Sequence, residues 1–470
     1  MIRLRVKPLC LFLLPVFLLA HFSKNHLQAD SQRTPSKLLS PSSEPVADRV
    51  PRPVSFGFQN HTPPPPLKDA QLRWEHPDLT IIQDKPLRYV VYENDPDEWE
   101  SMERDWEELD DEVLLRVPLG LEDPSLFVPA YNPVTKGKVL LGAMLFFDSR
   151  LSADLSVSCS SCHDPSKGYT DGAAVATGIQ QQTGGRSAPT IINAVYNSSQ
   201  FWDGRAASLE QQALGPQVAP IEMGNPTHES VVLRLRNIDT YNRQFRETFG
   251  TRVTVDGVAK AIASFERTIL AGGSKYDLHT QSLNNGGPGL LTAPERRGLT
   301  LFQNKAACNK CHAGANFTDN YGPTDVFHNI GSGWDKNRKQ FFNAANAIDL
   351  GRFQVVRQTL IGHYSTHEIG AFKTPTMRNL SQTAPYLHDG SEKTLMDVID
   401  FYNEGGRSNP YLDREMTVNG ITGGPPKKLN LTSKEKSDLM AFIHALNGHL
   451  VSIPIHEIPA TLPPGGEKAH

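Results

Sequence analysis

Four cysteines and two histidines of this chain fall into two copies of one short pattern, in which two cysteines separated by two residues are followed directly by histidine. The copies are Cys159-Ser160-Ser161-Cys162-His163 and Cys308-Asn309-Lys310-Cys311-His312. In c-type haem attachment, two thiols at this spacing form thioethers with the porphyrin vinyl groups, and the adjacent histidine is held beneath the iron. The sequence therefore predicts two covalent haem c groups, with His163 and His312 as iron ligands.

Other chemistry of cysteine and histidine fits these motifs less well. Zinc sites of this type pair C-x-x-C units roughly 15 to 20 residues apart, whereas residues 163–307, which are 307 − 162 = 145 in number, separate the two pairs here. A thioredoxin-like dithiol would need a βαβ setting and would not explain a histidine after each pair. The fifth cysteine, Cys10, lies in an apolar run and is interpreted as incidental.

The segments that position the motifs are predicted to be mainly α-helical, with long Gly/Pro loops and no run of alternating strands after residue 130. One amphipathic helix is expected to end at Gly272-Gly273, with an apolar face made by Val258, Ala261, Ile262, Phe265 and Ile269. Capping boxes are expected to open two further helices, at Thr292 with Glu295 and at Thr432 with Glu435. The second of these should close at Gly448.

Composition excludes several classes of protein. The chain has 470 residues, a formal net charge of −4 and a pI near 6.5, so it lacks the global basic surface of a nucleic-acid-binding protein. A mean hydropathy of −0.39 argues against a polytopic membrane protein. Arg3, Arg5 and Lys7 precede the uncharged residues 8–22, which is typical of a secretory signal, although an uncleaved anchor stays open. The protein is therefore expected to be exported.

The predicted fold class is mainly α, with two cytochrome-c-like helical haem domains packed together, long irregular loops and an N-terminal extension. Because each motif begins a module of about 150 residues, an internal duplication is the expected architecture. The expected parts are a signal peptide or anchor (1–29), a Ser/Pro-rich linker (30–66), an appendage of unknown role (67–128), a first haem domain (129–285), a second haem domain (286–455) and a tail (456–470). The acidic residues 93–112 of the appendage are interpreted as a solvated face on a small strand-plus-helix unit.

Residues around the motifs carry a specific resemblance over most of residues 138–448. Six stretches follow one another in family order: Leu141-Gly142-Ala143-Met144-Leu145-Phe146-Phe147-Asp148, Phe201-Trp202-Asp203-Gly204-Arg205, Glu222-Met223-Gly224, Phe265-Glu266-Arg267-Thr268, Phe372-Lys373-Thr374-Pro375 and Ala384-Pro385-Tyr386-Leu387-His388-Asp389-Gly390. In these stretches the chain resembles the bacterial di-haem cytochrome c peroxidases and their MauG relatives.

This resemblance implies a role for each matching residue. The haem on the first motif is similar to the family's peroxidatic haem, and the haem on the second motif is similar to its electron-relay haem. Trp202 matches the tryptophan that bridges the two haems, while Gln212 and Glu222 match the distal-pocket pair and Pro216 a residue lining that pocket. A carboxylate suits this place because peroxide cleavage needs a proton moved from the inner to the outer oxygen. A surface role for Glu222 is the alternative.

The second axial ligand of the relay haem is where the chain departs from the simple peroxidases. Those enzymes place Met eight residues after the Thr that opens a helix, whereas Thr394 is followed at that distance by Tyr402, as in MauG relatives. The i, i+3, i+4, i+7 spacing puts Tyr402 on one helical face with Leu395, Val398 and Ile399. An ordinary core tyrosine is the alternative, and Met396 lies on another face. A phenolate ligand would stabilise ferric iron and lower the haem potential.

The loop after the first motif is a second departure. Simple peroxidases carry a histidine there that caps the resting peroxidatic iron, but residues 177–189 contain none. An iron that reacts with peroxide without prior reduction is the resulting hypothesis. The family also holds a calcium ion between the haems: Thr383 and Pro385 match its carbonyl ligands, but Ser187 replaces the matching Asn. The remaining loop histidines are interpreted as loop or propionate contacts rather than iron ligands: His328, His363 and His367.

The leading functional hypothesis is an exported di-haem peroxidase that reduces hydrogen peroxide to water with electrons from a small c-type cytochrome or cupredoxin. A MauG-like oxidase that uses peroxide to oxidise side chains of a partner protein is the first alternative. An electron-transfer cytochrome without peroxide chemistry is the second, and Glu222 counts against it. The sequence names neither the electron donor nor any protein substrate.

Overall fold

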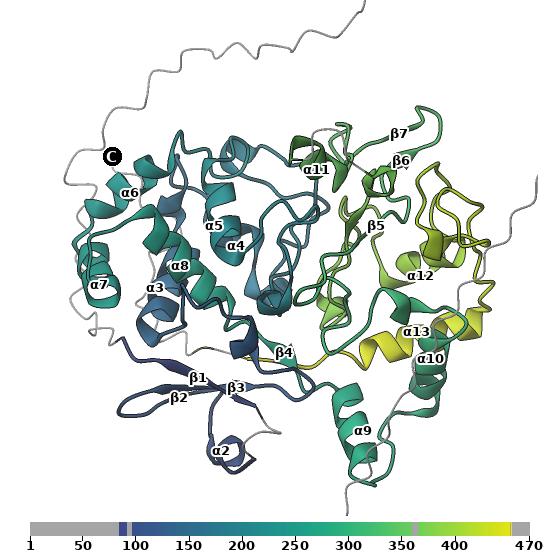
Figure 1. The fold of residues 1–470 in the computed structure, drawn as a ribbon, viewed down its shortest axis with the longest axis horizontal. Coiled ribbons are helices and arrows are strands. Elements are labelled where there is room, and N and C mark those ends of the chain that lie inside the picture. The colour runs from purple at the N-terminus through teal and green to yellow at the C-terminus, as the bar shows by residue number, and fades with distance from the viewer. Residues whose placement is uncertain (1–83, 92–95, 360–364, 452, 454–470) are drawn as a thin grey trace, which may run out of the picture. The chain divides into compact units, whose positions relative to one another are not determined.

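The computed structural model describes residues 84–91, 96–359, 365–451 and 453 (Figure 1). The predicted signal or anchor, the Ser/Pro-rich linker, the tail and His363 lie outside the described residues. Within the described part of the chain, no helix is long and apolar enough to cross a membrane.

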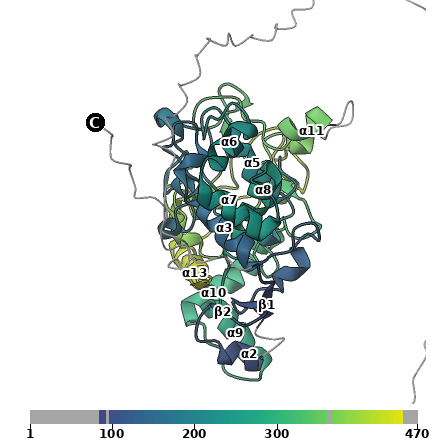
Figure 2. The ribbon, with the colours of Figure 1, turned by 90° about the vertical axis from the view of Figure 1, so that its left-hand side faces the viewer.

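The first module contains six helices, and the first motif lies on the second of them: α3 (Lys136–Phe146), α4 (Cys159–Cys162), α5 (Leu209–Val218), α6 (His228–Arg236), α7 (Asp239–Phe249) and α8 (Val255–Glu266). Helices α3 and α8 pack side by side, as Figures 1 and 2 show. A Cβ at Gly142 would lie 1.9 Å from the Ala261 carbonyl oxygen, so glycine permits this close approach. The predicted apolar face of α8 is buried, as expected.

The end of α8 differs from the prediction. The helix stops at Glu266, and Ala271–Gly272 instead forms strand β4, which pairs antiparallel with β9 (His449–Leu450). Ile269 is buried but lies beyond the helix. The two-residue strand uses backbone bonds that local periodicity cannot reveal, because its partner lies near the C-terminus.

The second half of the chain forms α9 (Lys275–Asn284), α10 (Ala293–Gln303), α11 (Phe353–Thr359), α12 (Leu395–Asn403) and α13 (Ser433–His444), of which α10 contacts the turn of the second motif. Both predicted capping boxes are present, at Thr292 for α10 and Thr432 for α13. Helix α13 ends at His444 rather than near Gly448. A Cβ at Gly448 would lie 2.1 Å from the Gly272 carbonyl oxygen, so this glycine serves the β4–β9 contact and not a helix end.

A three-stranded sheet forms the appendage, with strands β1 (Leu87–Val91), β2 (Trp106–Glu108) and β3 (Val113–Val117) in the order β1-β3-β2. Strand β1 runs parallel to β3, β2 runs antiparallel to it, and α2 (Pro96–Ser101) connects β1 to β2. Tyr89 and Trp106 share one hydrophobic core with α3 and α8, so the appendage packs on the first module. Arg378, from the second half of the chain, donates to the Gly120 carbonyl at 2.9 Å.

Two further strand pairs lie in the second half of the chain: β5 (Phe327–His328) with β8 (Phe372–Lys373), and β6 (Trp334–Asp335) with β7 (Gln340–Phe341). In the described part of the chain after residue 130, every strand has two residues, and helices and loops make up the rest. This agrees with the mainly helical prediction.

Candidate functional site

Each motif histidine is oriented by a backbone carbonyl. Nδ1 of His163 lies 3.2 Å from the Tyr169 oxygen, and Nδ1 of His312 lies 3.0 Å from the Phe317 oxygen. A ring that donates Nδ1–H in this way keeps its Nε2 lone pair free, which is the usual arrangement of metal-ligating histidines. Burial lowers the pKa of both imidazoles and so favours the neutral form that binds metal.

The four motif cysteines are free thiols beside these histidines. The first pair lies on the single turn of α4, and the second pair starts the 3-10 turn Cys308–Lys310. Burial raises the pKa of Cys162 and Cys308 to about 12, so these thiols are protonated at neutral pH. Since none of the four forms a disulfide, all four sulfur atoms are available for thioether bonds.

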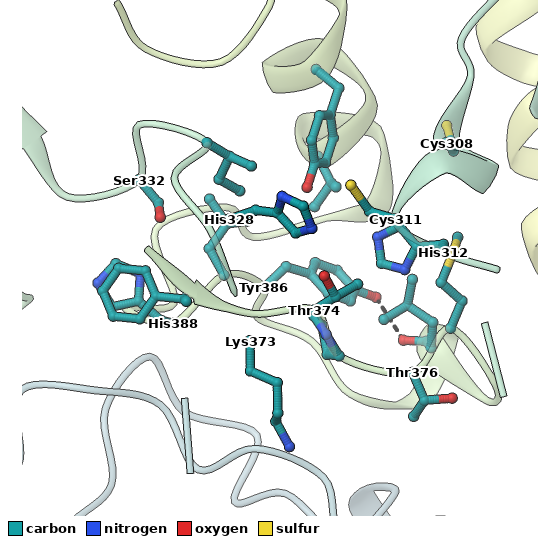
Figure 3. Close-up of a pocket in the computed structure, with 18 of the residues that line it drawn as sticks. Cys308, Cys311, His312, His328, Ser332, Lys373, Thr374, Thr376, Tyr386 and His388 are labelled. Atoms are coloured by element: carbon teal, nitrogen blue, oxygen red, sulfur yellow. Dashed lines mark hydrogen bonds between the residues drawn. The ribbon is translucent and has the colours of Figure 1, made fainter. Parts of the chain in front are cut away.

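A cavity of about 250 Å³ lies beside the second motif, with Cys308, Cys311 and His312 in its wall (Figure 3). Helices α12 and α13 contribute an apolar part of the wall, made by Leu395, Val398, Ile399, Leu439 and Ile443. A porphyrin requires an apolar cavity of this kind next to its two thiols and its ligating histidine. The residues of the second module therefore fit a haem c.

Tyr402 reaches this same cavity from α12, which confirms that it points inward with Leu395, Val398 and Ile399. Its hydroxyl has no hydrogen-bond partner among the described residues, and burial raises its pKa. Met396 does not line the cavity, but Met377 and Met416 do. These two thioethers were not singled out from the sequence, because they reach the cavity only through the folding of distant loops. Iron ligation by Tyr402 stays a prediction.

His328 lies in the cavity wall on β5, between two carboxylates. Its Nε2 is 2.6 Å from Asp319 and its Nδ1 is 2.7 Å from Asp413. Burial opposes its charge, but the two carboxylates raise the pKa of His328 to about 12. Since both nitrogens donate hydrogen bonds, neither is free for iron, which agrees with the interpretation that His328 is not a ligand. His367 is exposed and bonds to Thr422.

Trp202 is held by residues from both halves of the chain. Its Nε1 donates to the Ser187 carbonyl at 2.9 Å, and its own carbonyl accepts from the Lys373 amide at 2.8 Å. Trp202 also lines the cavity of the second motif, together with Ala188 and Pro189 from the loop that follows the first motif. An indole in this position lies between the two modules, as a bridge would.

The loop after the first motif contacts both that motif and the Glu222 segment. The Thr177 carbonyl lies 4.0 Å from Cys162 Sγ, and the Ile179 amide donates to the Glu222 carbonyl at 2.9 Å. A Cβ at Gly178 would overlap the Ile221 carbonyl oxygen at 2.0 Å, so only glycine allows this approach. The loop thus links the Glu222 segment to the first motif, and the distal-pocket role of Glu222 stays a prediction.

Gln212 and Pro216 lie one turn apart on α5. The Pro216 carbonyl accepts from the Met223 amide at 3.3 Å, which ties the end of α5 to the residue after Glu222. Burial raises the pKa of the Glu222 carboxyl, and the Arg205 guanidinium partly opposes this shift. A carboxyl with a raised pKa is better matched to proton transfer near neutral pH than an ordinary surface carboxylate.

The predicted calcium residues Ser187, Thr383 and Pro385 all line the cavity. The Ser187 hydroxyl donates to the Leu387 carbonyl at 3.0 Å, and the Thr383 hydroxyl donates to the Leu380 carbonyl at 3.0 Å. Among the described residues, one cluster of His, Cys, Asp or Glu atoms is close enough to hold an ion. It consists of Cys311, Asp319 and His328 and therefore includes a cysteine of the second haem motif. Calcium binding stays a prediction.

Comparisons with known proteins agree with this geometry. A family model described as di-haem cytochrome c peroxidase matches residues 136–285. The methylamine utilization protein MauG of Methylorubrum extorquens is 36% identical over 333 residues, which cover 70% of this chain and 84% of that protein. The cytochrome-c peroxidase IdrP1 of a Pseudomonas species is 32% identical over 361 residues, covering 72% and 88% of the two chains.

A solved structure described as a MauG-like protein associated with microbial copper homeostasis matches with a TM-score of 0.58 and 32% identity. The match covers 70% of this chain and 95% of the other. The di-haem peroxidase BthA from Burkholderia thailandensis has the same fold, with a TM-score of 0.51, 23% identity and coverage of 70% and 89%.

Proposed function

Since this chain belongs to the family of di-haem cytochrome c peroxidases and MauG proteins and is an oxidoreductase, we propose that it reduces hydrogen peroxide to water. One peroxide, two electrons and two protons give two waters, and the electrons come from a small c-type cytochrome or cupredoxin. The basic, apolar N-terminal segment supports an exported enzyme. Two bound haems would supply the redox-active iron, one to react with peroxide and one to relay electrons.

The chain's own residues would hold the cofactors and move the protons. Cys159 and Cys162 would anchor the first haem and His163 would ligate its iron, while the second motif would do the same for the relay haem. Glu222 would take the proton from the inner peroxide oxygen and deliver it to the outer one. Gln212 would orient the peroxide from α5.

The observation that carries this proposal is the placement of Trp202 between the modules. Its ring Nε1 donates to the Ser187 carbonyl in the loop after the first motif, and its backbone carbonyl accepts from the Lys373 amide on β8, beside the second motif's cavity. Electron passage from a relay haem to a peroxidatic haem needs such a fixed connection. A lone electron-transfer cytochrome would need neither this bridge nor Glu222.

Steady-state turnover of peroxide by the holo-protein, with a reduced small c-type cytochrome as donor, tests the proposal. The pyridine haemochrome assay should first give two covalent haems per chain. We expect cytochrome oxidation that depends on peroxide, at two cytochromes per peroxide. Two bound haems without peroxide-dependent oxidation would contradict the peroxidase proposal.

A MauG-like oxidase of partner side chains is the second candidate. It is favoured by Tyr402 in the relay cavity and by the similarity to MauG. In this case the diferric protein should consume peroxide while a partner protein, rather than a small cytochrome, loses the electrons. Peroxide-dependent oxidation of tyrosine or tryptophan side chains in a co-purified partner, detected by mass spectrometry, would support this candidate over the first.

A further inference from the structure

Lys373 is a buried lysine whose charge has no partner among the residues that the structure describes. It lies on β8 in the cavity wall and is only 8% exposed. Among the described residues, its Nζ atom forms neither a hydrogen bond nor an ion pair, although its backbone amide is bonded to Trp202. Buried ammonium groups are normally paired, because removing one from water is costly.

The nearby acidic group does not supply the missing partner. The Asp325 carboxylate is already engaged by Ser199 at 2.6 Å, Asn320 at 2.9 Å and Arg352 at 3.2 Å. Burial lowers the pKa of Lys373 to about 8, and the Asp325 charge only partly opposes this. A ligand anion in the cavity is therefore the group that would complete this site.

The position of Lys373 indicates which anion this is. Figure 3 shows Lys373 and His388 on the side of the pocket away from Cys308 and Cys311. The vinyl groups of haem, which bond the cysteines, lie on the porphyrin edge opposite its two propionates. A haem attached to Cys308 and Cys311 must then direct its propionates toward the side that holds Lys373.

Other basic groups on that side do not provide a free charge. Burial lowers the pKa of His388 to about 4, so this histidine is neutral at pH 7. Arg186 is paired with Asp349 at 2.6 Å and with Asp203 at 2.7 Å. Lys427 also lines the cavity but is exposed to solvent, so Lys373 is the buried cation that the second haem's carboxylates would meet.

We propose that the Lys373 ammonium forms an ion pair with a propionate of the haem attached to Cys308 and Cys311. This inference rests on the haem attachment in the proposed function. Because the Lys373 amide also holds the Trp202 carbonyl at 2.8 Å, the same residue would fix the bridging tryptophan relative to the carboxylate edge of the relay haem. Lys373 is then both a cofactor contact and a positioning residue for the bridge.

The reduction potential of the relay haem tests this ion pair in the holo-protein. A nearby cation favours the reduced haem, so Lys373→Met should lower that potential by about 59 mV, a tenfold change in the one-electron equilibrium. Lys373→Arg keeps the positive charge and should therefore retain most of the wild-type potential. The control Lys428→Met removes an exposed lysine paired with Glu404 and should leave the potential unchanged. An unchanged potential in Lys373→Met with both haems bound would overturn the proposal.

A measurement on the wild-type protein guards against a variant that fails to fold. Resonance Raman spectra of the holo-protein in H2O and D2O should show a propionate bending mode of the relay haem that shifts on exchange, because the ammonium protons exchange. A mode that does not respond would overturn the ion pair by itself. A haemochrome value of one haem per chain would instead contradict the proposed function, so the two failures are distinguishable.

Discussion

The two Cys-x-x-Cys-His modules are alike at the attachment point and differ in the side chains that lie near it. In both, the histidine Nδ1 meets a backbone carbonyl five or six residues later, at 3.0 Å for His312 and 3.2 Å for His163. The carboxyl of Glu222 lies near Cys162 of the first motif, whereas the phenol of Tyr402 lies in the second motif's cavity. The attachment motif therefore fixes the cofactor, while the residues near it decide its chemistry.

Both halves of the molecule contain a buried ion pair. Helix α5 of the first module is fixed to α8 by a buried ion pair between Glu210 and Arg267, at 2.7 Å. In the second half of the chain, a comparable buried pair joins Arg378 to Asp277, at 2.7 Å. An ion pair with two defined hydrogen bonds fixes the orientation of α5. This orientation matters because α5 carries Gln212 and Pro216.

The strongest test of the comparison removes the carboxyl of the first module. Glu222→Gln should slow peroxide reduction by about 10²–10⁴-fold, since a positioned acid–base group typically contributes that much. The control Glu229→Gln changes an exposed carboxylate on α6 and should retain full activity. The check is kcat/KM for peroxide on proteins that contain both haems. Normal turnover in Glu222→Gln would remove the chemical difference between the modules.

The buried anchor of α5 gives the second largest effect. Arg267→Leu leaves Glu210 as an unpaired buried carboxylate, and we expect a loss of about 3–5 kcal/mol in the free energy of unfolding. Asp256→Asn breaks the exposed Lys260 pair on α8 and should cost less than about 0.5 kcal/mol. Chemical denaturation of the holo-proteins measures both. Equal effects would show that the ion pair does not anchor α5.

This anchor has a defined pH dependence. Burial alone would raise the pKa of Glu210, but Arg267 and Asn132 overcome this and lower it. A carboxyl whose pKa is lower in the folded state stabilises the fold above its unfolded pKa and loses this contribution as pH falls. The difference in stability between wild type and Arg267→Leu should therefore shrink in acid, below about pH 4.

Tyr402 offers the test of the second module. If it ligates the relay iron, the ferric protein lacks the sulfur-to-iron charge-transfer band, and Tyr402→Met raises the haem potential. Met416→Leu and Met377→Leu are matched controls, because both thioethers line the same cavity. A thioether band in the wild type that disappears in either control would assign the ligand to methionine instead.

The smallest expected effect concerns the pH profile of the first module. Peroxide deprotonation needs ionised Glu222, so activity falls as pH drops through its raised pKa. Removing the opposing charge in Arg205→Gln should move this acid limb to higher pH by less than about one unit. The exposed Arg252→Gln serves as control. A limb that stays in place would show that Arg205 does not act on this carboxyl.

The reaction of the resting diferric protein with peroxide also tests the difference between the two modules. Residues 177–189 contain no histidine, and the Ile179 amide of this loop is bonded to the Glu222 backbone. We expect the diferric protein to react with peroxide without prior reduction, as followed by stopped-flow spectra. A lag that one-electron reduction removes would contradict an open first iron.

Sequence alone determined the features that depend on neighbouring residues. The spacing of cysteine and histidine predicted both haem attachment sites. The capping boxes at Thr292 and Thr432 are present at α10 and α13 as expected, because a capping box involves only four consecutive residues. Helical spacing also placed Tyr402 on the inner face of α12. Each of these follows from local geometry.

Tertiary structure alone decided what depends on segments far apart in the chain. Gly272 and Gly448 were expected to end helices, but they meet each other across the β4–β9 pair. Loops from both halves of the chain line one cavity, and only this arrangement brings Met416 into its wall. The same arrangement buries Lys373 without an ion-pair partner among the described residues. Burial and contacts between distant segments decide whether these side chains are charged and which site they line. A local sequence pattern contains no information about such contacts.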